Sequence, residues 1–162
     1  MGIGVFALPA NTIKSVDRKQ VGNDMGQGFT IKCEKCGTEN SYLQGIGIMY
    51  YSFLERTKED VIKGKFGKDA KAFLTDNPDC EFDARNEVYL CPECDYIKQD
   101  VDLKMKTVDK EYKKVYRCGK CRNAEMKPIK LDTERQYKRL SHIPCPKCND
   151  KGIKTIGMLM WD

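Results

Sequence analysis

The sequence predicts a mainly β protein with a small α insertion (α+β), arranged as tandem zinc β-ribbons. The motif Cys-x-x-Cys occurs four times, as CEKCG (33–37), CPECD (91–95), CGKCR (118–122) and CPKCN (145–149). Short segments rich in β-branched and aromatic residues lead into and out of these motifs, as expected of strands. The clearest helical periodicity lies between the first two motifs, so we expect a helical hairpin inserted in the first ribbon.

The first half of the chain predicts two strands and then two helices. Residues 28–33 predict a strand that enters the first motif, and residues 41–50 a strand or glycine-broken loop that leaves it. In residues 51–63, Leu54, Val61 and Ile62 recur at helical spacing, and Gly64 provides an end. A shorter helix is expected within residues 67–78, stopped by Pro78.

The second half predicts mostly strands. Residues 86–91 lead into the second motif, and in residues 100–108 Val101, Leu103 and Met105 alternate with polar residues. Further strands are expected in 113–118, 126–131, 140–145 and 152–161, whereas 132–140 fits a short helix or an exposed loop. The domain division expected is an N-terminal extension (1–27), a first zinc ribbon (28–108) with a helical insertion (about 50–76) and a second zinc ribbon (109–162).

Four Cys-x-x-Cys motifs predict two tetrahedral metal sites. Each motif can form a knuckle that directs both sulfurs to one point, and two knuckles complete a Cys₄ site. Left-handed backbone is expected after the second cysteine, where Gly37, Asp95 and Asn149 suit it and Arg122 does not. The expected cofactors are two Zn²⁺, with iron as an alternative because tetrahedral sulfur sites accept either metal. The predicted ligands are Cys33, Cys36, Cys91, Cys94, Cys118, Cys121, Cys145 and Cys148.

The pairing of the motifs has two alternatives. Sequential pairing joins the first motif to the second and the third to the fourth, whereas nested pairing joins the first to the fourth and the second to the third. We favour sequential pairing, because each ribbon then stays local and closes a shorter loop.

Other cysteine chemistry is less consistent with the pattern. The chain has nine cysteines, an odd number, and Cys80 lies outside the motifs, which argues against a disulfide framework. A redox dithiol would be expected as one motif in a βαβ unit, so thiol redox or metal transfer is a lesser alternative. The only histidine, His142, is expected to support a site or face solvent, because eight thiols already complete both sites.

The sequence also resembles a group of small uncharacterised bacterial zinc-ribbon proteins with four Cys-x-x-Cys pairs. The resemblance rests on the early motif, LQGIG, a helix ending in KGKFG, an NPD turn, YLCPEC and a late CPKC. It implies metal binding by all four pairs and brings no established activity.

The charge distribution suggests a macromolecular partner. The net charge is +5, but residues 1–97 hold 12 basic and 15 acidic residues and residues 98–162 hold 17 and 9. A basic C-terminal ribbon could bind nucleic acid or an acidic protein surface, and the alternatives are a protein–protein adaptor or an ordinary solvated strand face. Lysines interleaved with tyrosines suit single-strand binding. The nucleic-acid-binding candidates are Lys104, Lys106, Tyr112, Lys113, Lys114, Tyr116, Arg117, Lys120 and Arg122.

Several other functions are not indicated. Carboxylates form no recognisable catalytic pair, so we expect a protein that is not an enzyme and has no small-molecule substrate. The apolar opening at residues 2–10 is short and lacks a basic region before it, so neither a secretory signal nor a membrane span is expected. A cytoplasmic location, where thiols stay reduced, follows as the expectation.

Overall fold

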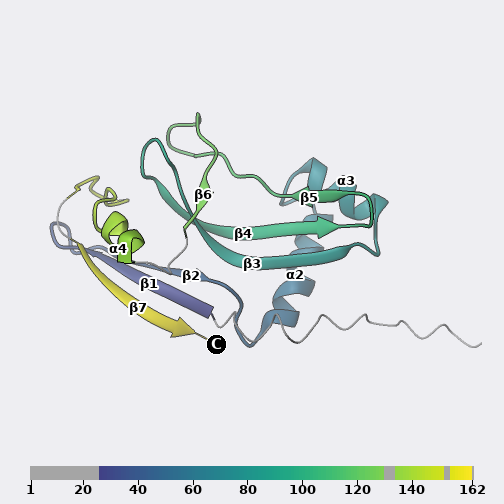
Figure 1. Ribbon diagram of the computed structural model, residues 1–162, viewed down its shortest axis with the longest axis horizontal. Helices are drawn as coiled ribbons and strands as arrows, with labels where there is room; N and C mark the ends of the chain where they lie inside the picture. The colour runs from purple at the N-terminus through teal and green to yellow at the C-terminus, as the bar shows by residue number, and fades with distance from the viewer. Residues whose placement is uncertain (1–25, 130–133, 152–153, 162) are drawn as a thin grey trace, which may run out of the picture.

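The fold is mostly β, as predicted. The computed structural model describes residues 26–129, 134–151 and 154–161, and within these ranges the strands form two antiparallel sheets (Figure 1). Most of the predicted N-terminal extension, residues 1–25, therefore lies outside the described residues.

The first sheet joins the two ends of the described chain. Its strands are β1 (Gly26–Cys33), β2 (Glu39–Gln44) and β7 (Lys154–Trp161), in the order β2-β1-β7. The last residue of β1, Cys33, pairs with Lys154 at the start of β7. The segments that contain the first and fourth motifs therefore meet at one end of this sheet.

The second sheet is a long hairpin with two short edge strands. Its strands are β3 (Glu81–Leu90), β4 (Ile97–Lys106), β5 (Glu111–Lys113) and β6 (Lys127–Pro128), in the order β5-β4-β3-β6. The second motif forms the turn between β3 and β4, where Leu90 pairs with Ile97. Since Leu90 also pairs with Lys127, β6 returns the chain from the third motif to the same end of the hairpin.

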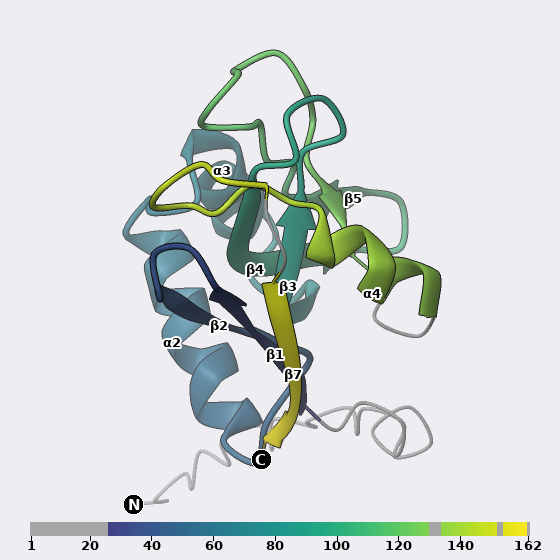
Figure 2. The ribbon, with the colours of Figure 1, turned by 90° about the vertical axis from the view of Figure 1, so that its left-hand side faces the viewer.

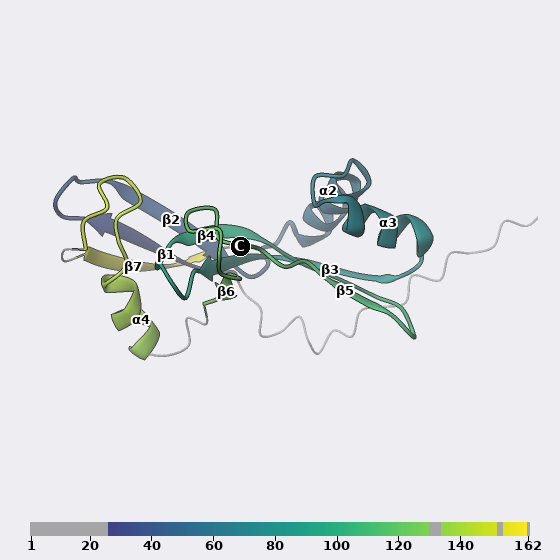
Figure 3. The same cartoon turned by 90° about the horizontal axis from the view of Figure 1, so that it is seen from above.

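Two helices lie between the first and second motifs, as predicted, and they cover the far end of the β3–β4 hairpin. They are α2 (Tyr50–Ile62) and α3 (Lys68–Asp76), and Figure 3 shows them together beside β3 and β5. Their apolar stripes bury Val61, Ala70 and Leu74 against Leu103 and Met105 of β4. The insertion between the first and second motifs thus has its own core.

The segment before the fourth motif is helical. The third described helix, α4 (Glu134–Ser141), occupies residues that the sequence left open between helix and loop. The strand expected over 140–145 is wrong, because the backbone N–H groups of His142 and Ile143 donate to the carbonyls of Arg139 and Leu140. These bonds continue the last turn of α4 and leave no ladder position for a strand.

The two sheets share a core. Gly45 at the end of β2 bridges to Asn86 of β3, and the backbone N–H of Leu43 donates to Oε1 of Gln99 at 2.7 Å. Apolar side chains from both sheets and from α4 form one buried cluster. Its members are Phe29, Ile31, Val88, Leu90, Ile97, Ile129, Leu140 and Ile143.

Phe29→Ala should destabilise both sheets together. The Phe29 side chain has no exposed surface, and loss of such a ring costs about 3–5 kcal/mol. Because the cluster joins the sheets, we expect one unfolding transition at a lower midpoint, followed by tryptophan fluorescence and far-UV circular dichroism. Two separate transitions, with only one displaced, would show that the sheets unfold independently.

Candidate metal centres

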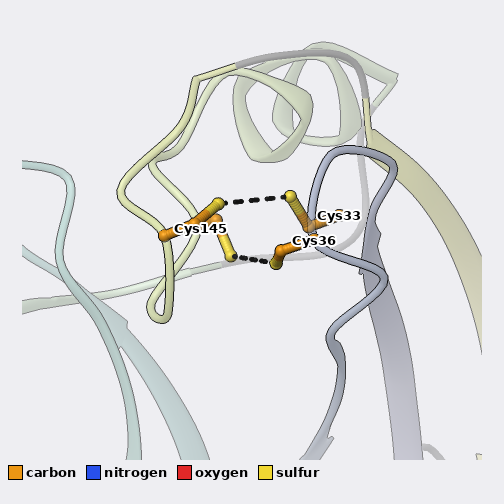
Figure 4. Close-up of side chains that lie close together, drawn as sticks. Cys33, Cys36 and Cys145 are labelled. Atoms are coloured by element: carbon orange, nitrogen blue, oxygen red, sulfur yellow. Dashed lines mark hydrogen bonds between the residues drawn. The ribbon is translucent and has the colours of Figure 1, made fainter.

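Eight cysteines gather in two groups of four. Among the described residues, the four sulfurs of each group lie within 4.8 Å of one another. Figure 4 shows the sulfurs of Cys33 and Cys36 facing those of the fourth motif. The outer cluster is Cys33, Cys36, Cys145 and Cys148, and the inner cluster is Cys91, Cys94, Cys118 and Cys121.

The clusters use nested pairing, so the sequential pairing favoured from the sequence is wrong. Loop closure favours sequential pairing only if the metal sites are the sole contacts that close the loops. In the fold, the β1–β7 ladder already brings Cys33 beside Lys154, so the outer cluster closes no further long loop. The domain division at residue 108 was built on sequential pairing and loses that support.

The four motifs form the same knuckle. In each, the residue after the second cysteine donates its backbone N–H to the carbonyl of the first cysteine, at 2.8–3.1 Å. In each, that residue also has a positive φ. The values are 69° at Gly37, 55° at Asp95, 61° at Arg122 and 57° at Asn149.

The third knuckle departs from the other three in two ways. It places an arginine at the left-handed position, and its closing bond runs from the N–H of Cys118 to the carbonyl of Ala124. In the second knuckle, for comparison, Cys91 bonds to Tyr96, one residue nearer along the chain. The knuckle geometry is therefore imposed on Arg122 by the surrounding structure rather than favoured by its residue type.

Arg122→Gly should stabilise the metal-loaded protein by about 1 kcal/mol, because a non-glycine residue in the left-handed region costs about 1–2 kcal/mol, part of which the freer unfolded glycine returns. The matched control is Gly37→Ala, whose added Cβ meets no atom within 4 Å, so its expected loss of about 1 kcal/mol reports backbone conformation alone. Denaturant midpoints of both variants measure the effect. Equal denaturant midpoints for Arg122→Gly and the parent protein would show that the left-handed backbone at Arg122 carries no free-energy cost.

The sulfur positions fit a tetrahedral metal ion. The Sγ atoms of Cys33 and Cys148 are 3.7 Å apart, as are those of Cys36 and Cys145. In the inner cluster the Cys91–Cys121 and Cys94–Cys118 separations are 3.7 and 3.5 Å. Four sulfurs at about 2.3 Å from a central zinc are about 3.8 Å apart, whereas disulfide-bonded sulfurs are about 2.05 Å apart. Both clusters therefore suit a four-thiolate ion and not disulfides.

Thiol pKa values in the inner cluster are spread apart. Burial would raise the pKa of Cys118, but backbone N–H groups of Cys121 and Lys120, at 3.5 and 3.4 Å from its sulfur, and neighbouring thiols lower it to about 6. Burial and the neighbouring thiols raise the pKa of Cys94 to about 12. Four crowded thiols resist full ionisation unless a cation compensates them.

The outer cluster shows the same spread. The hydroxyl of Thr38, 3.2 Å from the sulfur of Cys36, lowers the pKa of that thiol to about 6. The pKa of Cys148 is lowered by the backbone N–H of Asp150, but burial and the other three thiols outweigh it and raise the pKa to about 12. Metal binding should accordingly release protons and weaken in acid.

The two clusters are neighbours. Lys120, between the cysteines of the third motif, donates from Nζ to Oδ1 of Asn149 in the fourth knuckle at 3.0 Å. A guanidinium nitrogen of Arg139 in α4 lies 3.9 Å from a carboxylate oxygen of Asp95 in the second knuckle. Figure 2 shows these loops on the same side of the two sheets.

The single histidine and the ninth cysteine lie outside the two clusters. His142 is exposed, and its Nδ1 lies 2.7 Å from the carbonyl of Lys138 and 3.1 Å from Oγ of Ser141, so it caps α4. Cys80 is half-buried against the core below α2 and α3, and burial raises the pKa of its thiol.

The predicted nucleic-acid-binding residues separate into three places. Lys104, Lys106, Tyr112 and Lys113 lie on the β4–β5 pair, where the ring of Tyr112 is 5.9 Å from that of Phe73. The second place, after β5, holds Lys114, Tyr116 and Arg117. The third is the third knuckle, with Lys120 and Arg122.

Both tyrosines are already engaged within the protein. Tyr116 lies 5.1 Å from the ring of Tyr89, donates its hydroxyl to the carbonyl of Val101 at 2.7 Å, and has Lys98 Nζ 5.0 Å from its ring centroid. Stacking of bases on these rings, as the sequence suggested, would require their present contacts to break. Among the basic candidates, Lys106, Lys113, Arg117 and Arg122 are exposed and remain available for phosphate contacts, whereas Lys104 is paired with a carboxylate.

Sequence reasoning missed two sets of residues. Asp102, one of the polar residues that alternate with the apolar ones in 100–108, is buried beside Tyr89 and paired with Lys104 at 2.9 Å. The second set consists of residues that connect the segment after β5 with the α2–α3 turn. There, Nζ of Lys114 donates to the carbonyl of Phe66 at 2.8 Å. No local pattern links residues 48 positions apart.

Comparison of the chain with protein-family models, with curated proteins and with solved structures finds no match. The resemblance to bacterial zinc-ribbon proteins therefore stays a prediction. In the described part of the chain, no helix has the length and apolar character needed to cross a membrane.

Proposed function

We propose that this is a non-enzymatic zinc protein whose two structural Cys₄ sites hold a module that binds nucleic acid. The observation that carries the metal assignment is the grouping of eight sulfurs at tetrahedral separations. Bound zinc would supply charge compensation for four thiolates and a rigid link between two knuckles. A site closed by four cysteines leaves no coordination position for substrate, which favours a structural role.

The charge distribution supports nucleic acid as the partner. Residues 98–162 carry 17 basic and 9 acidic residues, and the basic candidates Lys106, Lys113, Arg117 and Arg122 are exposed. Lysine and arginine side chains that neutralise phosphates release counterions, and this release drives binding that is independent of sequence. The zinc sites would fix the strands and loops that carry these cations.

Salt dependence tests this function. Zinc-loaded full-length protein should bind a fluorescent 20-nucleotide single strand with an affinity that falls steeply with salt, by a slope of about −0.7 in log K against log salt per phosphate contacted. Fluorescence anisotropy between low and moderate salt measures it. An affinity that is unchanged over this range would contradict binding through phosphate contacts, and no binding at low salt would exclude nucleic-acid binding.

An exposed apolar surface favours a protein adaptor as the second candidate. Ile48, Met49 and Tyr51, at the start of α2, are 81, 67 and 76 % exposed. Met49 also lines a cavity of about 330 Å³, together with residues that include Gly45 and Phe53. A one-to-one protein partner that survives nuclease treatment, and is lost with Met49→Glu, would support the adaptor, and retention of the partner by this variant would contradict it.

A further inference from the structure

We infer that an open groove between the α2–α3 turn and the segment after β5 is the place where a single nucleic-acid strand binds through its phosphates, an inference that rests on the proposed function. The groove has a volume of about 700 Å³. Its walls come from segments distant in sequence: the end of α2 and the α2–α3 turn on one side, and β4 with the segment after β5 on the other. The lining residues are Asp60, Lys65, Phe66, Lys98, Asp100, Lys114, Val115, Tyr116 and Arg117.

The groove carries an excess of positive charge that its own carboxylates do not balance. Two of its four cations are paired, Lys65 with Asp60 at 2.8 Å and Lys98 with Asp100. Among the described residues, Lys114 and Arg117 form no ion pair with a carboxylate, although the charge of Arg117 helps to lower the pKa of Glu125. The uncompensated charge of the groove is therefore concentrated on two side chains three positions apart in sequence.

The side chain of Lys114 is held in place by protein contacts, and its ammonium group still has unused hydrogen-bond donors. Its ammonium group gives one hydrogen bond, to the carbonyl of Phe66 at 2.8 Å, and lies 5.7 Å from the ring centroid of Tyr116. An ammonium group has three donors, so two remain for phosphate oxygens. Because its position is already fixed by protein contacts, less rotamer entropy is lost when a ligand binds.

Arg117 lies exposed at the other end of this segment. Its backbone bridges to Glu125, but the carboxylate of Glu125 is paired with Lys127 at 2.8 Å. The guanidinium of Arg117 is thus able to bind phosphate through its fork of donors, a geometry that lysine lacks.

The rings explain why phosphates rather than bases are the expected contact. Tyr116 forms part of the groove wall, and the Tyr89 ring and the ammonium groups of Lys98 and Lys114 already lie against its ring. Base stacking supplies much of the affinity of other single-strand binders. Here the ring of Tyr116 already has these contacts, and the other aromatic lining residue, Phe66, is partly buried against the core under α2 and α3. A groove closed on one side by the α2–α3 turn also admits a flexible strand more readily than a stiff duplex. We therefore expect binding with little sequence preference and weaker binding of duplex.

The experiment compares three double variants of equal charge loss in the zinc-loaded full-length protein. Lys114→Gln with Arg117→Gln removes the unpaired groove cations. Lys106→Gln with Lys113→Gln removes two other cations of the basic segment, on the β4–β5 pair. Lys68→Gln with Lys71→Gln, on the exposed surface of α3, is the matched control.

The probe is a fluorescent 20-nucleotide single strand, with a duplex of the same length for comparison. The groove variant should bind the strand at least about tenfold more weakly, and its slope of log K against log salt should be smaller by about 1.4 if two phosphate contacts are lost. The other two variants should each lose about twofold or less. Metal content and melting temperature establish that every variant is folded, and Arg117→Gln alone changes an exposed side chain that makes no hydrogen bond or ion pair among the described residues.

Each of the other outcomes contradicts a specific part of the proposal: the groove, the preference for a single strand, or nucleic-acid binding itself. If the parent protein binds but the groove variant binds equally well, the groove assignment is wrong and the proposed function stands. If all three variants weaken binding alike, binding is a diffuse charge effect. Equal or tighter binding of the duplex contradicts a single-strand groove, and a parent protein that binds neither probe removes the proposed function together with the groove.

Discussion

Cys33→Ser combined with Cys145→Ser is expected to leave one bound metal ion per chain, because both changes fall in the outer cluster. Cys33→Ser combined with Cys91→Ser is expected to leave none tightly bound, because one ligand is lost from each cluster. Each variant retains seven cysteines, so the number of thiols is the same. Native mass spectrometry and elemental analysis count the ions.

The reciprocal result would contradict the nested arrangement. If sequential pairing were correct, Cys33→Ser with Cys145→Ser would damage both sites and Cys33→Ser with Cys91→Ser only one. Should the outer-cluster variant fail to fold, Cys94→Ser with Cys118→Ser makes the same comparison in the inner cluster, where one ion is again expected to remain.

Removal of both metal ions should unfold the core that joins the two sheets. A structural zinc site contributes about 10–16 kcal/mol, and a whole domain is stable by only about 5–15 kcal/mol. The inner cluster supports this core directly, since Cys91 follows Leu90 and Cys118 packs with Tyr89 and Met126. Near-UV circular dichroism and amide exchange at Val88 and Leu90 should both report loss of structure on chelation.

The control is the same chelator saturated beforehand with zinc, which should change nothing. Readdition of two equivalents of zinc under reducing conditions should restore the signal. A chelated, metal-free protein that keeps its near-UV spectrum and its melting temperature would show that apolar packing alone holds the fold.

Local patterns were sufficient for most of the strands and helices and for the ligands, but the strands expected over 113–118 and 140–145 are wrong. The alternation of Leu103 and Met105 predicts β4, helical spacing around Val61 predicts α2, and the repeated Cys-x-x-Cys motif identifies all eight cysteines that cluster. These features depend on residues within one strand, one helix or one turn. Their physical causes therefore act over a few positions in the chain.

The features that were not predicted depend on contacts between distant segments. The pairing of β1 with β7 decides which motifs share a metal site. The sequence of residues 26–33 contains no local pattern that predicts pairing with residues 154–161. Burial of Asp102 depends on Tyr89 from the neighbouring strand, and the groove depends on the α2–α3 turn lying beside Lys114. At Arg122 the local prediction was unfavourable but the conformation forms. Arginine disfavours the left-handed backbone, yet the knuckle imposes it.

X-ray absorption at the metal edge, combined with a thiol count on the same sample, tests the central claim most directly. Two closed four-thiolate sites predict two ions per chain, a shell of four sulfurs at about 2.3 Å with no nitrogen or oxygen, and one further thiol, Cys80, outside the sites. A shell containing nitrogen or oxygen, or cysteines joined as disulfides with no metal between them, would contradict the account.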